Sequence, residues 1–183
     1  YRWVELYVRY RKKITLGMTG ATIADIAGEN PAIIELINAH RDLIDIIYRP
    51  FSHDIATMRT EQGFTKNLRL GIAAANNAFP GTNPSFLPPE FMLTNQQVKI
   101  LQDHGISTTF ICADRFSANS LIEIPSRCYR VYGVHDSSLI NIPFHGALTA
   151  LYHKTVQQYD TTAWNSAIAA PEGDVFFWRD GES

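Results

Sequence analysis

The chain has 183 residues, 45% of them hydrophobic and 19% charged, with a formal net charge of −2 at pH 7. This composition is typical of a globular protein that can bury a sizeable core, and we expect a single domain over residues 1–183. The small net charge argues against nucleic acid or an anionic membrane as a partner, and no apolar run approaches the roughly 20 residues that cross a bilayer.

Strand and helix patterns alternate through most of the chain. The expected helices cover residues 3–13, 22–40 with a break at 28–31, 65–77 and 94–104, and the expected strands cover 14–18, 43–48, 85–87 and 106–113. Thr94 and Gln97 have the spacing of a capping box, and Gly105 follows the expected end of that helix. Alternation of this kind predicts a parallel sheet.

The remainder of the chain adds two short strands, two helices and a last strand. The strands are expected at 128–133 and 139–142 with a turn at Asp136-Ser137, the helices at 147–158 and 162–169, and the last strand at 174–178. Tyr1 lies in a helical pattern without a cap, so we expect the chain to be a piece of a longer protein. One pair of cysteines, Cys112 and Cys128, is no disulfide framework and fits a reduced, cytoplasmic protein.

Motifs for metals and nucleotide cofactors are absent from the sequence, and we predict neither ligand. Zinc-type spacing of cysteine and histidine does not occur. The segment Gly17-Met18-Thr19-Gly20 has too few glycines for a phosphate-binding loop, and no lysine follows in the required place. The Gly-x-Ser-x-Gly motif of serine hydrolases is missing as well.

Four expected strands are followed by side chains that can take part in catalysis: His53, Glu90, Asp114 and Asp180. The carboxyl ends of parallel barrel strands meet on one face, where barrel enzymes keep their chemistry. Two prolines directly before Glu90 stiffen the exit from its strand, and a rigidly held carboxylate suits a nucleophile or a general acid. The alternative is an ordinary loop glutamate after a proline-rich turn.

Glu90 and Asp180 together are the candidate catalytic pair. Hydrolysis of a glycosidic bond uses two carboxyl groups that flank the sugar, one as nucleophile or base and the other as proton donor. A separation of about 5–5.5 Å between the carboxyl groups gives retention, and about 6.5–9.5 Å gives inversion. Asp180 also precedes Gly181, so a structural turn aspartate is the competing interpretation.

Three further residues are candidates for substrate contacts. His53 could hydrogen-bond a sugar hydroxyl or ligate a metal, or it could be a structural histidine in a loop. Asp114 could form an active-site ion pair with Arg115, or an ordinary surface pair. Trp178 could stack on a sugar face or belong to the core.

Three segments occur together in a recognisable order. They are Asp-Ile-Ile-Tyr-Arg-Pro-Phe-Ser-His at 45–53, Phe-Leu-Pro-Pro-Glu at 86–90, and Phe-Trp-Arg-Asp-Gly-Glu at 177–182. They resemble the Glu-Ile…His, Trp-Pro-Pro-Glu and Asp-Gly-Glu motifs of glycoside hydrolase family 57. The resemblance covers roughly residues 14–183, because the run after Glu90, which ends in His-Gly-Ile, also fits.

The resemblance implies an α/β fold of the (β/α)7-barrel type, incomplete at its N-terminus because the family's first motif, His-Gln-Pro, is missing. It also implies a retaining α-glycoside hydrolase or glucanotransferase that acts on an α-glucan type of oligo- or polysaccharide. In that case Glu90 is the nucleophile and Asp180 the general acid/base. The substrate would contact side chains that include His53, Asp45, Asp114 and Trp178.

The chain departs from the family pattern at three positions within the matching segments. Leu87 stands where the family usually has tryptophan, Arg49 replaces a frequent histidine, and Asp45 replaces a glutamate.

Two other functions therefore stay open. One is a metal-dependent hydrolase like the polysaccharide deacetylases, although a His-x-x-x-His pair and an early Asp-Asp are absent. The other is a barrel that binds carbohydrate without catalysis.

Overall fold

The computed structural model describes residues 2–111 and 128–143, and the side chains from Val4 onward within those ranges. The chain divides into two compact units, one of Tyr1–Thr109 with Arg130–Ile140 and one of Phe110–Tyr129 with Asn141–Ser183. The first unit contains all the described helices. The helices predicted at 147–158 and 162–169 and the strand predicted at 174–178 lie outside the described residues.

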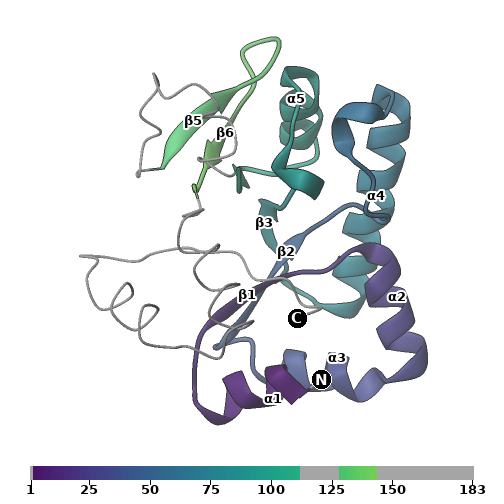
Figure 1. Cartoon of the computed structure of the whole chain (residues 1–183), viewed down its shortest axis with the longest axis vertical. Helices are drawn as coiled ribbons and strands as arrows, with labels where there is room; N and C mark the ends of the chain where they lie inside the picture. Colours follow the sequence, from purple (N-terminus) through teal and green to yellow (C-terminus); the bar gives the residue numbers. More distant parts are fainter. Residues whose placement is uncertain (1, 112–127, 144–183) are drawn as a thin grey trace, which may run out of the picture. The chain divides into compact units, whose positions relative to one another are not determined.

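The described elements alternate between strand and helix up to β4, as the sequence predicts (Figure 1). The helices are α1 (Arg2–Arg9), α2 (Gly20–Glu29), α3 (Pro31–Ala39), α4 (Glu61–Ala78) and α5 (Asn95–Asp103), with two 3-10 turns, η1 (Ala56–Met58) and η2 (Pro89–Phe91). The strands are β1 (Ile14–Gly17), β2 (Ile44–Tyr48), β3 (Asn83–Phe86), β4 (Thr108–Thr109), β5 (Tyr129–Tyr132) and β6 (Ser138–Asn141). Among the described helices, none combines the length and apolar character needed to cross a membrane.

The strands form one sheet in the order β1-β2-β3-β4-β6-β5. The pairs β1–β2, β2–β3 and β3–β4 are parallel, which confirms the predicted parallel sheet. A turn with positive φ at His135 and Asp136 connects β5 to β6, one residue earlier than the predicted turn. Because β1, β2 and β3 run in the same direction, the loops that leave them meet at one edge of the sheet.

Helix boundaries follow from side-chain caps. Thr94 and Gln97 form the predicted capping box, with the Gln97 amide accepting from the Thr94 N–H at 2.9 Å and the Thr94 hydroxyl accepting from the Gln97 N–H at 3.2 Å. The helix predicted at 65–77 begins earlier, at Glu61, because the Thr60 hydroxyl accepts a hydrogen bond from the Gly63 N–H. Gly63 lowers helix propensity, which obscures this start in the sequence.

The strand predicted at 106–113 is much shorter in the structure. Within the described part of this segment, residues 106–111, only Thr108–Thr109 is a strand. Ile106 completes the end of α5 instead, because its N–H bonds to the Leu101 carbonyl. Ile111 N–H then bonds to the Asn141 side chain at 2.7 Å instead of to a neighbouring strand.

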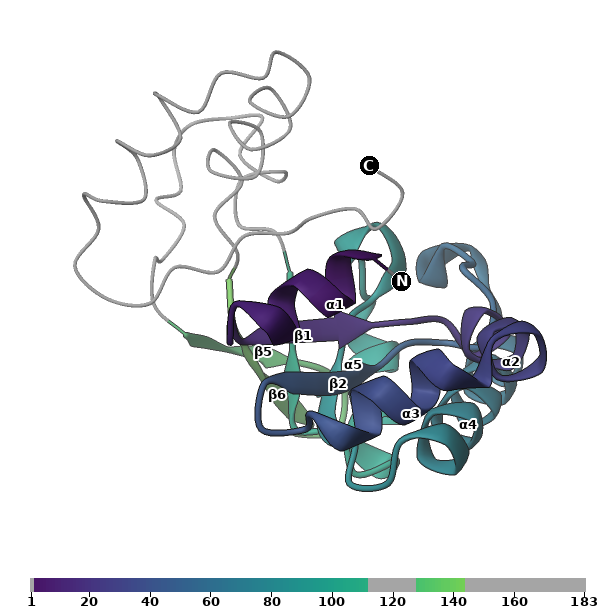
Figure 2. The ribbon, with the colours of Figure 1, turned by 90° about the horizontal axis from the view of Figure 1, so that it is seen from below.

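Two clusters of buried side chains hold the first unit together. Helices α2 and α4 also pack against each other (Figures 1 and 2). The first cluster joins α1–α4 to β1 and β2 through residues such as Ile23, Ile37, Ile44, Ile46 and Phe79. The second joins α4 and α5 to β3 and β6 through Phe64, Leu68, Phe86, Leu101 and Leu139. Each fully buried side chain of this size stabilises the fold by about 1.5–3 kcal/mol.

Strand β3 is irregular where it meets β2. Ile47 pairs with Asn83, but the next residue, Tyr48, pairs with Phe86, so β3 carries extra residues at this point. Pro84 lies in the irregular stretch, and a proline has no N–H to donate to a ladder. Pairing then resumes, with the Leu87 N–H donating to the Tyr48 carbonyl at 3.0 Å. The residues after Leu87 therefore leave the sheet beside the loop that follows β2.

Candidate active site

The candidate site lies where three loops leave the carboxyl ends of β1, β2 and β3 (Figure 1). The loop after β2 carries Arg49 and His53, and the turn after β3 carries Glu90. His53 Nε2 lies 3.6 Å from Glu90 Oε1, and His53 Nδ1 lies 3.3 Å from Arg49 Nη2. The structure thus brings together two of the predicted site residues, His53 and Glu90, and adds Arg49 to them.

Glu90 is held in an unusual backbone conformation. Its φ and ψ are 52° and 15°, and the next residue, Phe91, also has a positive φ of 57°. Side chains with a Cβ rarely adopt this left-handed region, and each such residue costs about 1–3 kcal/mol unless the surroundings impose it. The buried Phe91 ring and hydrogen bonds from Phe91 N and Met92 N to the Pro88 and Pro89 carbonyls hold the turn.

This turn directs the Glu90 side chain outward. Pro88, Pro89 and Phe91 are buried on either side of it, while 44% of the Glu90 side chain is exposed. His53 is similarly open, with 51% of its side chain exposed. Both groups are therefore within reach of a ligand at the carboxyl edge of the sheet, on a backbone that is fixed below them.

The loop that carries Arg49 and His53 is anchored to two helices. The first two amides of α2, on Gly20 and Ala21, donate to the carbonyls of Pro50 and Phe51 at 3.1 and 2.8 Å. Phe51 N–H in turn donates to the carbonyl of Asn67 in α4 at 3.0 Å. The amino end of α2 therefore holds the loop after β2 in place through these two hydrogen bonds.

Beyond His53, a polar network holds the next residues of the loop. Asp54 Oδ2 accepts hydrogen bonds from Arg59 Nη2 at 2.5 Å, Ser52 Oγ at 2.6 Å and Asn67 Nδ2 at 3.1 Å. The bond from Arg59, followed by that from Ser52, lowers the pKa of the Asp54 carboxyl below its usual value. The Gln97 side-chain amide also donates to the Ala56 carbonyl at 2.6 Å, which ties the loop to α5.

We expect Asp54 to stabilise the fold above about pH 4. A carboxyl whose pKa is lowered in the folded state contributes stability above its unfolded pKa, near 3.8, and loses it as the pH falls through the folded pKa. Asp54→Asn should therefore lower the free energy of unfolding by about 1 kcal/mol at pH 7. Urea unfolding at pH 7 and at pH 3 measures the difference, which should shrink at the lower pH.

Asp103→Asn is the matched control for this experiment. Like Asp54→Asn, it neutralises an aspartate that is paired with a cation. The pair lies on the surface of α5, where Lys99 Nζ lies 2.5 Å from Asp103 Oδ1. Exposed pairs of this spacing contribute only about 0.3–0.5 kcal/mol. Equal effects of Asp54→Asn and Asp103→Asn at pH 7 would show that the loop network adds nothing beyond a surface ion pair.

Of the other predicted site residues, only Asp45 is among the described ones. It is the second residue of β2, half-buried, and it accepts a hydrogen bond from the Asn83 side chain at 3.2 Å. Asp45 therefore lies toward the amino end of its strand, whereas Arg49 and His53 follow the carboxyl end. Asp114, Trp178 and Asp180 lie outside the described residues.

Two residues that support the site, Asn67 and Gly71, are not predicted from the sequence. Both lie on α4, four positions apart and therefore on one face, and both contact the backbone of the loop after β2. A Cβ on Gly71 would lie 2.8 Å from Phe51 N, so the loop passes directly over this glycine. The buried face of α4 otherwise carries apolar side chains, namely Phe64, Leu68 and Ala75. A glycine and an asparagine on such a face could have indicated that a backbone segment packs there.

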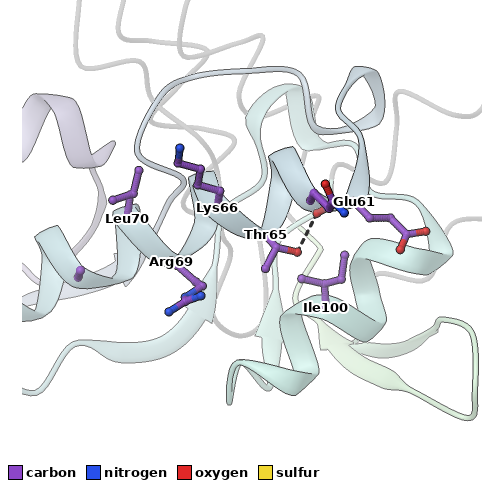
Figure 3. A pocket seen from close by; sticks show the side chains of 8 residues that line it. Glu61, Thr65, Lys66, Arg69, Leu70 and Ile100 are labelled. Atoms are coloured by element: carbon purple, nitrogen blue, oxygen red, sulfur yellow. Dashed lines mark hydrogen bonds between the residues drawn. The ribbon is translucent and has the colours of Figure 1, made fainter.

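A shallow groove lies along α4 (Figure 3). It has a volume of about 720 Å³ and is lined mainly by α4, with Ile100 contributed by α5. Lys66 and Arg69 give it a positive rim, and none of the residues around Glu90 lines it. Within residues 2–111 and 128–143, no group of three histidine, cysteine, aspartate or glutamate side chains could hold a metal ion.

Comparisons with known proteins indicate a family. The family model described as glycosyl hydrolase family 57 matches residues 5–169. A search of curated proteins found no match. Several solved structures resemble this chain, all with low sequence identity.

The 4-alpha-glucanotransferase of Thermococcus litoralis matches with a TM-score of 0.72 and 14% identity, over 88% of this chain and 27% of that protein. The exo-type maltose-forming amylase of Pyrococcus sp. ST04 matches with a TM-score of 0.75 and 15% identity, over 94% and 29%. A proposed polysaccharide deacetylase of Mycobacterium smegmatis matches with a TM-score of 0.61 and 20% identity, over 80% and 46%. The chain thus spans less than half of each protein, and the likeness confirms the predicted α/β fold, consistent with part of a barrel.

Proposed function

The chain belongs to glycosyl hydrolase family 57, and from this premise we propose that it is the catalytic part of a retaining α-glycoside hydrolase or glucanotransferase. The observation that carries the proposal is Glu90: an accessible carboxylate, at the carboxyl edge of a parallel sheet, on a turn with a fixed and strained backbone. Strain of this kind is concentrated at functional sites. The segment around Glu90 is also the one that resembles the family's nucleophile motif.

In the proposed reaction Glu90 is the nucleophile. One carboxylate oxygen attacks the anomeric carbon, the glycosidic C–O bond breaks, and Asp180 gives its proton to the departing oxygen. Asp180 then acts as base and takes a proton from water or from an acceptor sugar, whose oxygen displaces Glu90. The two inversions together retain the α configuration. The role of Asp180 is supported by the resemblance of the Asp-Gly-Glu segment.

The proposed substrate is an α-glucan type of oligo- or polysaccharide. Its support is the family assignment, together with structural likeness to a glucanotransferase and a maltose-forming amylase. We assign His53 as a substrate contact, because it lies beside Glu90 with half its side chain exposed. Asp114 and Trp178 complete the proposed substrate-binding set on the basis of the resemblance. Asp45 belongs to that set by the resemblance alone, because it lies toward the amino end of β2, on the far side from Glu90.

Covalent trapping tests the proposal directly. The full chain is incubated with 5-fluoro-α-D-glucosyl fluoride, which forms a glycosyl-enzyme quickly and releases it slowly, and the digest is examined by mass spectrometry. We expect the added sugar on the peptide that contains Glu90, and no labelling of Glu90→Gln. A label on another residue, or binding of maltooligosaccharide to a chain that is never labelled, would contradict the proposal, and the latter outcome would favour a non-catalytic barrel.

A further inference from the structure

The contact between Arg49 and His53 restricts the protonation of the histidine ring. Arg49 Nη2 lies 3.3 Å from His53 Nδ1. A guanidinium carries only donors and keeps its charge at all accessible pH values, so in this pair Nδ1 must be the acceptor. An imidazole that accepts at Nδ1 has no proton there, and its single proton is on Nε2.

The other ring nitrogen faces Glu90. His53 Nε2 lies 3.6 Å from Glu90 Oε1, slightly beyond hydrogen-bonding range. Hydrogen bonds of catalytic groups are often long before substrate binds and shorten in the complex. With its proton on Nε2, His53 can donate to the carboxylate. The opposite tautomer would place a ring lone pair against the negative oxygen.

The position of Arg49 depends on its neighbours at the ends of β1 and β3. A Cβ on Gly17 would lie 3.2 Å from Arg49 Cδ and 3.1 Å from Leu87 Cδ2, so the arginine stem and the leucine methyl both pack over this glycine. Arg49 and Leu87 are also two of the positions where the chain departs from the family pattern.

From these contacts we propose that Arg49 is a positioning residue that holds His53 as its Nε2–H tautomer, so that His53 donates to Glu90. The inference rests on the proposed function in that Glu90 is taken as the nucleophile. A donor at 2.7–3.1 Å would orient the carboxylate so that one oxygen faces the anomeric carbon. In this proposal Arg49 acts on Glu90 through His53, so its loss should change the chemical step more than the binding of substrate.

The tautomer itself can be measured without any activity. Long-range ¹H–¹⁵N correlation spectra of the labelled full chain distinguish protonated from unprotonated ring nitrogens, and His53→Gln identifies the His53 signals by their absence. We expect a proton on Nε2 and none on Nδ1 at neutral pH. Arg49→Met keeps the stem and removes the donors, and it should give a mixture of tautomers or a proton on Nδ1. Arg69→Met, on the surface of α4, is the matched control and should leave the spectrum unchanged.

Kinetics provide a second readout. The amide nitrogen of glutamine lies near the place of Nε2, whereas that of asparagine lies near Nδ1. His53→Gln should therefore retain more kcat than His53→Asn and His53→Ala, which each lower it about tenfold. Arg49→Met should also lower kcat about tenfold, and with little change in KM, because Arg49 does not itself contact the substrate in this proposal. A histidine that only contacts substrate would instead show its effect in KM.

Two results separate this inference from the proposed function. A proton on Nδ1 of His53 in the wild-type chain, or an Nε2–H tautomer that persists in Arg49→Met, overturns the role of Arg49 whatever the activity of Glu90→Gln. Full activity of Glu90→Gln overturns the proposed function, and the tautomer spectra then still report on the Arg49–His53 pair. Equal kcat values for His53→Gln and His53→Ala would also count against the inference.

Discussion

Glu90→Gln should lower kcat by about 10⁴–10⁶-fold, the order of loss that follows removal of a nucleophile in enzymes with covalent catalysis. An amide has nearly the size of a carboxylate but does not attack an anomeric carbon. Because Glu90 is 44% exposed and the exchange keeps the shape of the side chain, we expect the free energy of unfolding to stay within about 0.5 kcal/mol of the wild-type value. Turnover of maltooligosaccharide and thermal unfolding, measured on the same preparation, separate the two effects.

A matched control makes the same chemical change elsewhere. Glu61→Gln alters an exposed carboxylate in the first turn of α4, which lines the groove and is not one of the proposed site residues. It should keep full activity. Near-normal turnover of Glu90→Gln would remove the central residue of the proposed mechanism.

Rescue by azide tests whether Glu90 is the group that attacks the anomeric carbon. Glu90→Gly removes the carboxylate and suits the backbone, since glycine adopts a φ of 52° without strain. Azide can then attack the anomeric carbon from the vacated side as the glycosidic bond breaks and Asp180 protonates the leaving oxygen. The expected product is a β-glycosyl azide, of configuration opposite to the substrate. Restored turnover with the α product would show that Glu90 is not the attacking group.

The arrangement of the strands around this residue could be predicted from the sequence. Alternating β-branched runs and helix patterns predicted that β1 to β4 form a parallel sheet, and the Thr94–Gln97 spacing predicted the start of α5. The position of Glu90 after the carboxyl end of β3 also followed from its place directly after a short buried strand. These features depend on local sequence, so a single chain contains enough information to predict them.

The conformation of the site could not be predicted in the same way. Glutamate and phenylalanine both disfavour positive φ, so nothing local indicates the left-handed pair at Glu90 and Phe91. That pair exists because Phe91 is buried and the flanking prolines restrict the turn. The bond between Asn67 and the loop after β2 likewise joins residues fifteen positions apart, and its cause lies in the packing of α4.

A consequence of this packing is that the site has two separate supports. The turn at Glu90 is held by its own buried neighbours, whereas the loop with Arg49 and His53 is held by α2, α4 and α5. Changes in the helices should therefore affect His53 before they affect Glu90. Gly71 is a position at which the α4 backbone lies directly against the loop.

Gly71→Ala should be the most damaging substitution of a glycine in the described helices. The new Cβ would overlap the Arg49 carbonyl oxygen and lie 2.8 Å from both Phe51 N and Pro50 C. All three atoms belong to the backbone, so no side-chain rotation relieves the clash. Overpacking of this kind costs about 1–3 kcal/mol or more, which exceeds the gain of about 1 kcal/mol that alanine brings to a helix.

Two measurements follow from this clash. A net loss of about 2 kcal/mol lowers Tm by about 4–8 °C in a chain of this size. The shift of the Arg49 carbonyl also moves the loop that carries His53, and a displacement of about 1 Å at a catalytic group can cost up to 10²-fold in rate. We therefore expect kcat to fall in Gly71→Ala even at temperatures where the protein is fully folded, as verified by circular dichroism.

Gly28→Ala provides the opposite case on a neighbouring helix. Gly28 lies in α2, and a Cβ there would meet nothing within 4 Å. Alanine should therefore raise the stability by about 0.5–1 kcal/mol, with unchanged kcat, because only the helix propensity changes. If Gly71→Ala instead raised Tm as Gly28→Ala does, the α4 backbone could not lie against the β2 loop, and the helix support of His53 would have to be abandoned. A drop in Tm without a drop in kcat would confirm that α4 packs against the loop, but would show that this packing does not affect the reaction at Glu90.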